Sequence, residues 1–425
     1  MIHEVRLPHE TKFYLWQITC LQIDVLTCAV QLQSGFTERN LQTALRRKMH
    51  QQRAALVTNW ICNHRDTREG LQTFVTGTQC ERQHLVMSMQ RDVLRLYCAR
   101  RNETLECCFA NNLPEYQKGA KQFLLAFYGQ LSNGTTTDIL ASNPRNYHRY
   151  GREQFFKAYE KANPRQSVCA ICDEHRPITI IRGHVHSDIE HYFPKSVHPH
   201  LACHPYNLIP ICNACNSAHR DRDPLNSRNH TRRTLIEVFL PYRNETVLTH
   251  GAVKFEWVQT KESPALSIIA RDKNASNLFD TRMKAFSEIY DIPQRWRRQI
   301  HRIGEQLWRQ MTAFARAEFE RDGSLDIFNV KAGLERLLYY LIADLKSNSW
   351  NYVLVWYLGH LLITEIEANF ENQQSENALI QTLEDCIKLS SSIGKSFRFS
   401  LPPDQVIEIS RDLYTYLSLD KPFFP

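Results

Sequence analysis

The chain has 425 residues, of which 43% are hydrophobic and 11% aromatic. This composition supplies enough apolar side chains for buried cores and excludes a globally disordered protein. A chain of this length exceeds one ordinary core, so we expect two or three folded units. The formal net charge of +7 is only mildly basic and by itself barely favours a nucleic-acid partner.

The sequence predicts a cytoplasmic protein without a membrane segment. Its first residues lack the basic start and continuous apolar core of a signal peptide. The apolar stretch 352–363 is too short to span a bilayer. The thirteen cysteines are therefore expected as thiols or metal ligands and not as disulfides. Helical apolar spacing predicts small structural thiols at Cys20, Cys28, Cys98, Cys107, Cys108 and Cys386.

Residues 1–164 form a predicted helical N-terminal region. Apolar residues recur at steps of three and four in 12–62, 70–132 and 151–162. Cysteine and histidine also occur in this region, at spacings that match no zinc module. We interpret them as core and surface residues of helices: Cys62, His64, Cys80 and His84.

Residues 165–230 differ in kind, because Pro, His, Cys and Asp replace the helical pattern. The stretch "ITIIRGHVHSDIEHY" alternates in the manner of a strand or hairpin, and "NACNSAHRD" has room for a short helix. Residues 231–425 are expected to contain short strands at 251–260 and 265–272, followed by a helical C-terminal region. Within 294–320 an apolar stripe at helical spacing predicts a core or partner face.

Two Cys-x-x-Cys pairs predict a structural zinc site. Cys169 and Cys172 form one pair, and Cys212 and Cys215 form the other. A tight turn aims both sulfurs of such a pair at one ion, and four thiolates leave no open position for chemistry. A redox dithiol is the alternative, although no strand–helix–strand pattern surrounds either pair. We expect this Zn²⁺ to fasten both ends of the 39-residue insert, which has too little apolar content to fold alone.

Inside this frame, "DIEHYFPKS" followed by "NLIPICNACNSAH" resembles the HNH endonucleases, a ββα-metal nuclease family. The resemblance covers about 60 residues. It implies an α+β, mostly helical fold with a central zinc-braced ββα-metal (HNH) unit at 165–230 and helical regions on both sides. Its motif positions correspond to Glu190 and His191, Asn207, and Asn216.

The chemistry of phosphodiester hydrolysis suits these residue types. Neutral histidine is the natural base near pH 7, so His191 is expected to take the proton of the attacking water. Glu190 and the amide oxygen of Asn216 are ligands that Mg²⁺ or Mn²⁺ would accept. Asn207 more plausibly ties the loop by side-chain hydrogen bonds. The family often has aspartate where Glu190 stands, and Asp188 would share its strand face.

Basic residues around the motif are candidates for phosphate binding. Lys195 lies in the "FPKS" segment, and His219 and Arg220 stand where relatives often carry lysine. A second basic segment, "QRWRRQIHR" at 294–302, fits either a solvated helix face or a phosphate-binding strip.

The resemblance implies a metal-dependent endonuclease that hydrolyses DNA and leaves 5′-phosphate and 3′-hydroxyl ends. The large flanks without motifs suggest regulation by a targeting or regulatory protein partner. By analogy with the family, they also suggest a prokaryotic antiviral defence or restriction system. The alternative is a zinc-stabilised, non-catalytic nucleic-acid-binding or scaffolding protein, which would need the cysteines but not the acid, histidine and asparagine.

Overall fold

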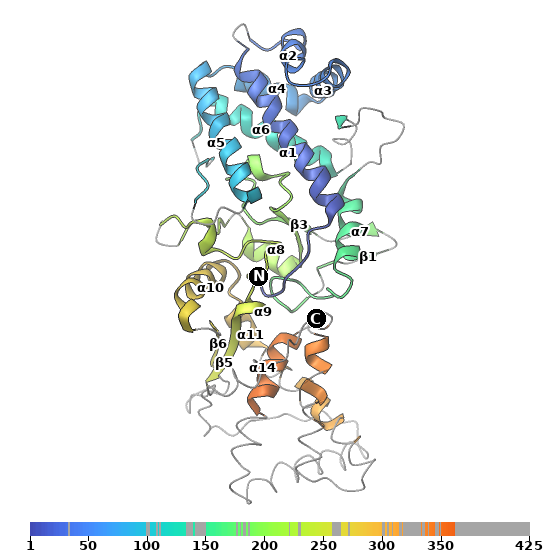
Figure 1. Cartoon of the computed structure of the whole chain (residues 1–425), viewed down its shortest axis with the longest axis vertical. Helices are drawn as coiled ribbons and strands as arrows, with labels where there is room; N and C mark the ends of the chain where they lie inside the picture. The colour runs from blue at the N-terminus through green and yellow to red at the C-terminus, as the bar shows by residue number, and fades with distance from the viewer. Residues whose placement is uncertain are drawn as a thin grey trace, which may run out of the picture.

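The computed structural model describes most of residues 1–361 as an elongated molecule (Figure 1). The N-terminal helices form one end, short strands lie in the middle, and the described C-terminal elements lie toward the other end. The expected helix at 403–418 lies outside the described residues, as does most of 329–390. The residues left out are 33–34, 99–102, 108, 110–111, 133–138, 141–149, 176, 179, 182–183, 186–187, 221, 228–230, 257–264, 271–272, 300–301, 304–305, 308, 314–316, 318–332, 334–335, 339, 345–347, 349 and 362–425.

The N-terminal region is helical as predicted, and local signals explain several helix starts. Thr37 accepts a hydrogen bond from the Asn40 amide at the start of one helix. Thr78 and Glu81 bond each other's backbone amides at the start of another, which satisfies two donors reciprocally. The helices are α1 (His9–Val30), α2 (Glu38–Leu45), α3 (Gln51–Asn63), α4 (Arg65–Phe74), α5 (Gln79–Cys98), α6 (Glu115–Ser132) and α7 (Arg152–Ala162).

Helix α1 is long and apolar enough to cross a membrane by length and composition alone. In the fold, 61% of its most apolar window is buried inside the molecule. Its buried face includes Leu15, Ile18 and Leu26, which belong to the same core as α3, α4 and α6. The burial accounts for the apolar composition, as in the core helix of a globular unit.

The expectation of structural thiols holds for some cysteines and fails for one. Cys28 and Cys107 are buried, whereas Cys20 is half-buried. Cys98 is exposed at the end of α5, so the prediction that it packs in a core was wrong. Residues before it on α5 are apolar and buried, but Cys98 is the last residue of the helix, and its side chain is in contact with solvent. Cys108 and Cys386 lie outside the described residues.

The central region contains the strands that the alternating pattern predicts and the short helix expected in "NACNSAHRD". Strands β1 (Ile180–Ile181) and β2 (His184–Val185) form a small antiparallel hairpin. Strand β3 (Asp188–His191) then pairs antiparallel with β4 (Leu208–Ile211), which places Glu190 opposite Ile209 and His191 opposite Leu208. A single turn of 3-10 helix, η3 (Pro199–Leu201), lies between these two strands, and helix α8 (Asn213–His219) follows β4 directly.

The C-terminal region contains strands within the two stretches expected, 251–260 and 265–272. They pair antiparallel, and helices follow them. The apolar stripe is a core face at Trp296, Ile303, Leu307 and Met311, whose exposed fractions do not exceed 4%. The elements are η4 (Leu235–Glu237), α9 (Val247–His250), β5 (Gly251–Glu256), β6 (Ala265–Ala270), η5 (Lys273–Ala275), α10 (Ser276–Tyr290), α11 (Ile292–Arg298) and α14 (Asn351–Leu361).

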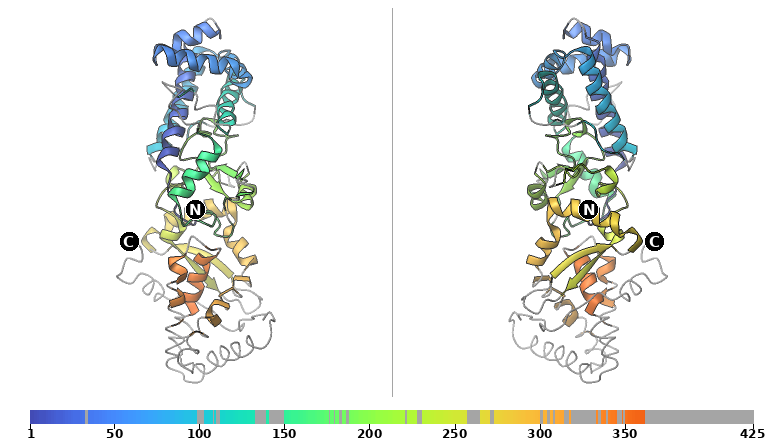
Figure 2. Two further views of the ribbon diagram at one scale, coloured as in Figure 1. Left: turned by 90° about the vertical axis from the view of Figure 1, so that its right-hand side faces the viewer. Right: turned by 90° about the vertical axis from the view of Figure 1, so that its left-hand side faces the viewer.

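Two hydrophobic cores meet at the central strands. Leu208 of β4 belongs to the core of the N-terminal helices. Ile209 and Ile211 of the same strand belong to a second core, which also contains residues of β5, β6, α10 and α14. Both side views keep the N-terminal helices and the β5–β6 pair on opposite sides of this segment (Figure 2). The central strands are therefore covered from both sides, because successive strand residues point to opposite faces.

The contact between α4 and α6 is unusually close. A methyl group built on Gly119 would lie 2.4 Å from the Phe74 amide nitrogen, and one on Gly70 would lie 2.6 Å from the Phe123 nitrogen. Backbone atoms cannot yield at such distances, so only glycine fits. Gly129, also on α6, has open space where a side chain would stand.

We predict that Gly119→Ala lowers the free energy of unfolding by about 1–3 kcal/mol, because the added methyl forces the helices apart. Gly129→Ala is the matched control on the same helix. It should leave stability unchanged or raise it by up to about 1 kcal/mol, because alanine restricts the unfolded chain. Urea unfolding of both variants measures the difference. Equal stability of the two variants would contradict the close contact.

Candidate metal centre and catalytic site

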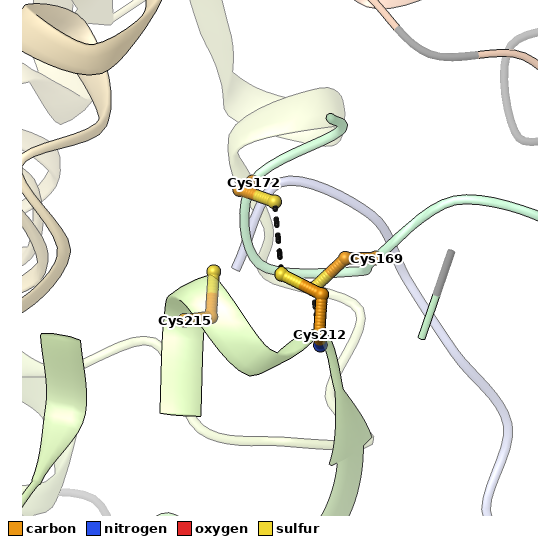
Figure 3. Close-up of side chains that lie close together, drawn as sticks. All are labelled: Cys169, Cys172, Cys212 and Cys215. Carbon is orange, nitrogen blue, oxygen red and sulfur yellow. Dashed lines mark hydrogen bonds between the residues drawn. The ribbon is translucent and has the colours of Figure 1, made fainter. Parts of the chain in front are cut away.

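The four cysteines predicted as zinc ligands come together. Their sulfur atoms lie within 4.8 Å of one another, and all four residues are buried (Figure 3). The first pair lies in the turn after α7, and the second spans the end of β4 and the start of α8. The Cys172 and Cys212 sulfurs are 3.6 Å apart. Sulfurs bound to one tetrahedral zinc lie about 3.8 Å apart, given the usual Zn–S bond length.

The surroundings of the sulfurs also suit a metal thiolate centre. The backbone amide of Cys212 donates to the Cys169 sulfur at 3.5 Å, and the Glu174 amide donates to the Cys172 sulfur at 3.4 Å. Hydrogen bonds from the neighbouring cysteines hold the pKa of the Cys212 thiol well below its ordinary value. Burial raises the pKa of the Cys172 and Cys215 thiols well above the ordinary value, so without a metal the group favours one thiolate, at Cys212. A bound zinc ion would displace the remaining protons, because the thiolate is the form that binds zinc.

Two residues of helix α11 contact the cysteine group. The Arg295 guanidinium donates to the Cys215 sulfur at 3.3 Å and lies 3.0 Å from the Glu174 carboxylate. The Trp296 indole donates to the Cys172 carbonyl at 2.9 Å. Arg295 is therefore directed at the cysteine group and not at a solvent-facing phosphate. A single phosphate-binding strip at 294–302 is incompatible with this position of Arg295.

His191 lies at the end of β3 and is 5% exposed. Its Nε2 is 3.2 Å from the Ala202 carbonyl oxygen. Its ring packs edge-on against the ring of Tyr128 in α6, with the two ring centres 4.4 Å apart. Because a carbonyl only accepts, Nε2 must carry the proton and Nδ1 the lone pair. Burial and the nearby Lys195 charge lower the pKa of His191 to about 3, so the ring is neutral at pH 7.

Glu190 precedes His191 on β3, and its side chain is 16% exposed. One carboxylate oxygen lies 2.8 Å from Nδ1 of His219, which belongs to α8 and is fully buried. The opposite ring nitrogen of His219, Nε2, lies 3.0 Å from the Tyr192 carbonyl. Asp188 also belongs to β3, but its side chain is outside the described part of the chain.

Asn207 is fully buried where the chain enters β4. Its amide oxygen accepts from the Phe193 amide at 2.7 Å, and its amide nitrogen donates to the Phe193 and Leu201 carbonyls. These three hydrogen bonds close the loop that follows His191. They agree with the loop-tying role expected of this residue.

One cavity joins most of the predicted site residues. It has a volume of about 350 Å³, and Glu190, His191, Lys195, Asn216 and Arg220 line it. Buried Asn207 and His219 do not line the cavity but support residues that do. The predicted acid, base and amide therefore face one space, next to the cysteine group that holds the start of α8.

Sequence reasoning missed the residues that the N-terminal helices add to this cavity. Tyr128 and Leu131 of α6, Tyr150, and Arg152 and Phe155 of α7 also line it. They lie far upstream of the motif, and nothing in their local pattern marks them. Only the packing of the helices against β3 brings them to the site.

Two other histidines of the insert, His198 and His204, are fully buried. His198 bridges the Cys107 carbonyl and the Asp223 carboxylate at 3.1 and 3.0 Å. His204 is fully buried beneath Trp16, and burial lowers its pKa to about 3. The four cysteines are the one group of metal-binding side chains that the described residues bring close enough to hold an ion with three or more His, Cys, Asp or Glu ligands.

Comparison of the chain with protein-family models, curated proteins and solved structures found no match.

We predict that freshly purified protein contains about one zinc ion per chain, because four buried thiolates complete one tetrahedral shell. Cys172→Ser should lower the zinc content and the resistance to unfolding. Exposed Cys80→Ser, the control, should change neither. Elemental analysis and thermal unfolding measure both effects. Zinc-free wild-type protein with a disulfide at these positions would instead support the redox alternative.

We also predict acid sensitivity from His204. Its folded pKa of about 3 lies below the unfolded value near 6.5, so only the unfolded chain gains a proton as the pH falls between these values. This residue should therefore cost roughly 2 kcal/mol of stability between pH 7 and pH 5. The stability difference between the two pH values, measured by urea unfolding, should shrink in His204→Gln. It should persist in exposed His84→Gln. Equal pH dependence in both variants would exclude the effect.

Proposed function

We propose that this chain is a metal-dependent HNH endonuclease that hydrolyses phosphodiester bonds in DNA. The observation that carries the proposal is the cavity where Glu190, His191 and Asn216 meet, beside the four-cysteine group. The order β3, β4, α8 is the order of a ββα unit, and each of these residues comes from β3 or α8. The four cysteines are the proposed structural zinc ligands, and the proposal assigns the zinc no chemistry.

In this proposal His191 is the general base. Its protonated Nε2 is engaged by the Ala202 carbonyl, so Nδ1 is the nitrogen that takes the proton of the attacking water. The edge-on contact with Tyr128 restricts rotation of the ring. A base in a fixed orientation requires less reorganisation during the reaction than a mobile one.

Glu190 and Asn216 are the proposed holders of Mg²⁺ or Mn²⁺. The donors are oxygen atoms, which these ions prefer, and both residues line the same cavity. Magnesium in nucleases uses few protein ligands together with substrate phosphate and water, so two residues are a sufficient set. When bound, the ion would stabilise the charge that develops on the phosphoryl and leaving oxygens.

His219 was expected to bind substrate phosphate, but its full burial disfavours that role. We propose that it positions Glu190 in its doubly protonated form, because Nε2 donates to the Tyr192 carbonyl and only a second proton lets Nδ1, 2.8 Å from the carboxylate, attract Glu190. Asn207 holds the loop between the two strands. Exposed Lys195 and Arg220 remain the proposed phosphate-binding residues, because both line the cavity beside the acid and the base.

The competing proposal is a zinc-braced binding or scaffolding protein without catalysis. The contacts of Arg295 and Trp296 with the four-cysteine group would serve such a protein equally well. It does not require an acid, a neutral histidine and an amide around one cavity, so the nuclease explains more of the observations. A regulatory or targeting partner remains part of the nuclease proposal, since the helical flanks carry no chemical motif.

We predict that the protein with Mg²⁺ or Mn²⁺ cleaves DNA and that His191→Ala slows cleavage by roughly 10²–10⁴-fold, as expected for loss of a general base. Asn216→Ala should also slow cleavage strongly, whereas Asn216→Asp should retain more of the activity because an oxygen ligand remains. A screen of single-stranded, duplex and plasmid DNA measures the rates, with exposed His84→Ala as control. Circular dichroism and zinc content establish that each variant is folded.

Cleavage by His191→Ala at the wild-type rate would remove this residue from the mechanism. DNA binding that persists in EDTA, with no cleavage under either ion, would favour the non-catalytic alternative.

A further inference from the structure

Part of the cavity lining, next to the proposed base, is apolar and aromatic. Leu15 of α1, Tyr128 and Leu131 of α6, Tyr150, and Phe155 of α7 form this wall, which we call the aromatic wall. A metal ion and a phosphate need only the polar side of the cavity. The aromatic wall therefore requires a different explanation, either as packing alone or as a surface for an apolar part of the substrate.

The aromatic wall is rigid. The Tyr150 hydroxyl is 2.5 Å from the Thr11 hydroxyl, and the Tyr150 ring stacks on Tyr14 at 4.7 Å. Tyr150 and Phe155 are at most 3% exposed, so the surrounding core holds them in place. Tyr128 is only half-buried and contacts His191 directly. The Lys195 ammonium lies 4.9 Å from the centre of the Tyr128 ring, so a planar group reaches this preformed surface beside the proposed base by displacing that ammonium from the ring.

Three basic residues line the cavity. Lys195 and Arg220 come from the central region, and Arg152 comes from the first turn of α7. All three are exposed. Guanidinium groups bind phosphate in two-pronged geometry, and a helix start adds favourable backbone dipoles. A polyanion at the proposed catalytic residues would therefore meet positive groups from two separate parts of the chain.

The size of the cavity suits one nucleotide. Its volume of about 350 Å³ lies near the lower end of small-ligand pockets, which span roughly 300–1,000 Å³. A base inside a duplex is stacked and paired, and it reaches such a pocket only after it is unpaired. A base in a single strand needs no such step, and stacking on aromatic side chains favours it regardless of sequence.

We propose that the cavity takes one nucleoside of an unpaired DNA strand, with its base on the aromatic wall and the adjoining scissile phosphate at His191. This inference rests on the proposed function and specifies its substrate as single-stranded DNA or the unpaired tail of a duplex. Tyr128 is a specificity-determining residue in this arrangement, and Arg152 holds a phosphate of the same strand.

Cleavage of three end-labelled DNA substrates tests the proposal: a single strand, the same sequence as a blunt duplex, and a duplex with an unpaired tail. With the full chain and Mn²⁺, we expect the single strand and the tail to be cut at least tenfold faster than the duplex interior. Equal or faster cutting inside the duplex would overturn the inference and leave the nuclease proposal intact.

Two variants separate the roles. Arg152→Ala should weaken binding of the single strand several-fold and reduce its salt dependence, because one phosphate contact is lost. Lys161→Ala is the control, since it removes the same charge from the far end of α7 and does not line the cavity. Tyr128→Leu should reduce the preference for the single strand over the duplex by about tenfold. A similar loss on both substrates would mean that Tyr128 only supports His191.

A binding measurement decides the inference even if no substrate is cut. A single-stranded oligonucleotide that contains the fluorescent base 2-aminopurine is titrated with zinc-loaded His191→Ala protein without added Mg²⁺ or Mn²⁺. Stacking should quench the fluorescence, and Tyr128→Leu in the same background should relieve the quenching. The inference is wrong if binding leaves the fluorescence unchanged or if duplex DNA of equal length binds as tightly.

Discussion

The structure depends most on the joining of two distant chain segments by four sulfur atoms. Cys169 and Cys172 lie before the central strands, and Cys212 and Cys215 lie after them. Short strands of four residues cannot hold themselves together in water. A metal bound by both pairs would stabilise the folded segment, because its binding free energy adds to the free energy of folding, and it would fix where α8 starts. Every proposed catalytic side chain lies between the two pairs or directly after the second.

The turn that carries the first cysteine pair also makes hydrogen bonds to the start of the chain and to the C-terminal region. Its Ala170 carbonyl accepts from the Ile2 amide, and its Cys172 carbonyl accepts from Trp296. Asp173 bonds His3 at 2.6 Å and receives the Tyr352 amide. The beginning of the chain and two C-terminal helices therefore meet at the turn that carries the first cysteine pair. A zinc ion bound there, as proposed, would therefore support packing well beyond the central strands, which fits a structural role for that ion.

Much of the fold could be predicted from the sequence because its signals are local. Apolar steps of three and four mark α1 to α7, and alternation marks β3. The Cys-x-x-Cys spacing marks the sulfur cluster, because a tight turn is sufficient to aim two sulfurs. Burial was predicted less well. Cys98 is exposed although its neighbours are apolar, and Arg295 faces a sulfur although its neighbours suggest a solvated helix. The exposure of Cys98 and the direction of Arg295 depend on which elements pack against each helix, and residue spacing in the sequence carries no information about that.

By itself, the sequence determined the element order, the four-cysteine group, and the acid, histidine and asparagine types around one motif. Only the tertiary structure decided which of these side chains face a shared cavity. It buried His219 behind Glu190 and Asn207 inside the loop, while Asn216 lines the space. It also brought Tyr128 of a distant helix against His191. The physical reason is that a motif specifies neighbours along the chain, whereas the shape and polarity of a cavity depend on every surface that packs around it.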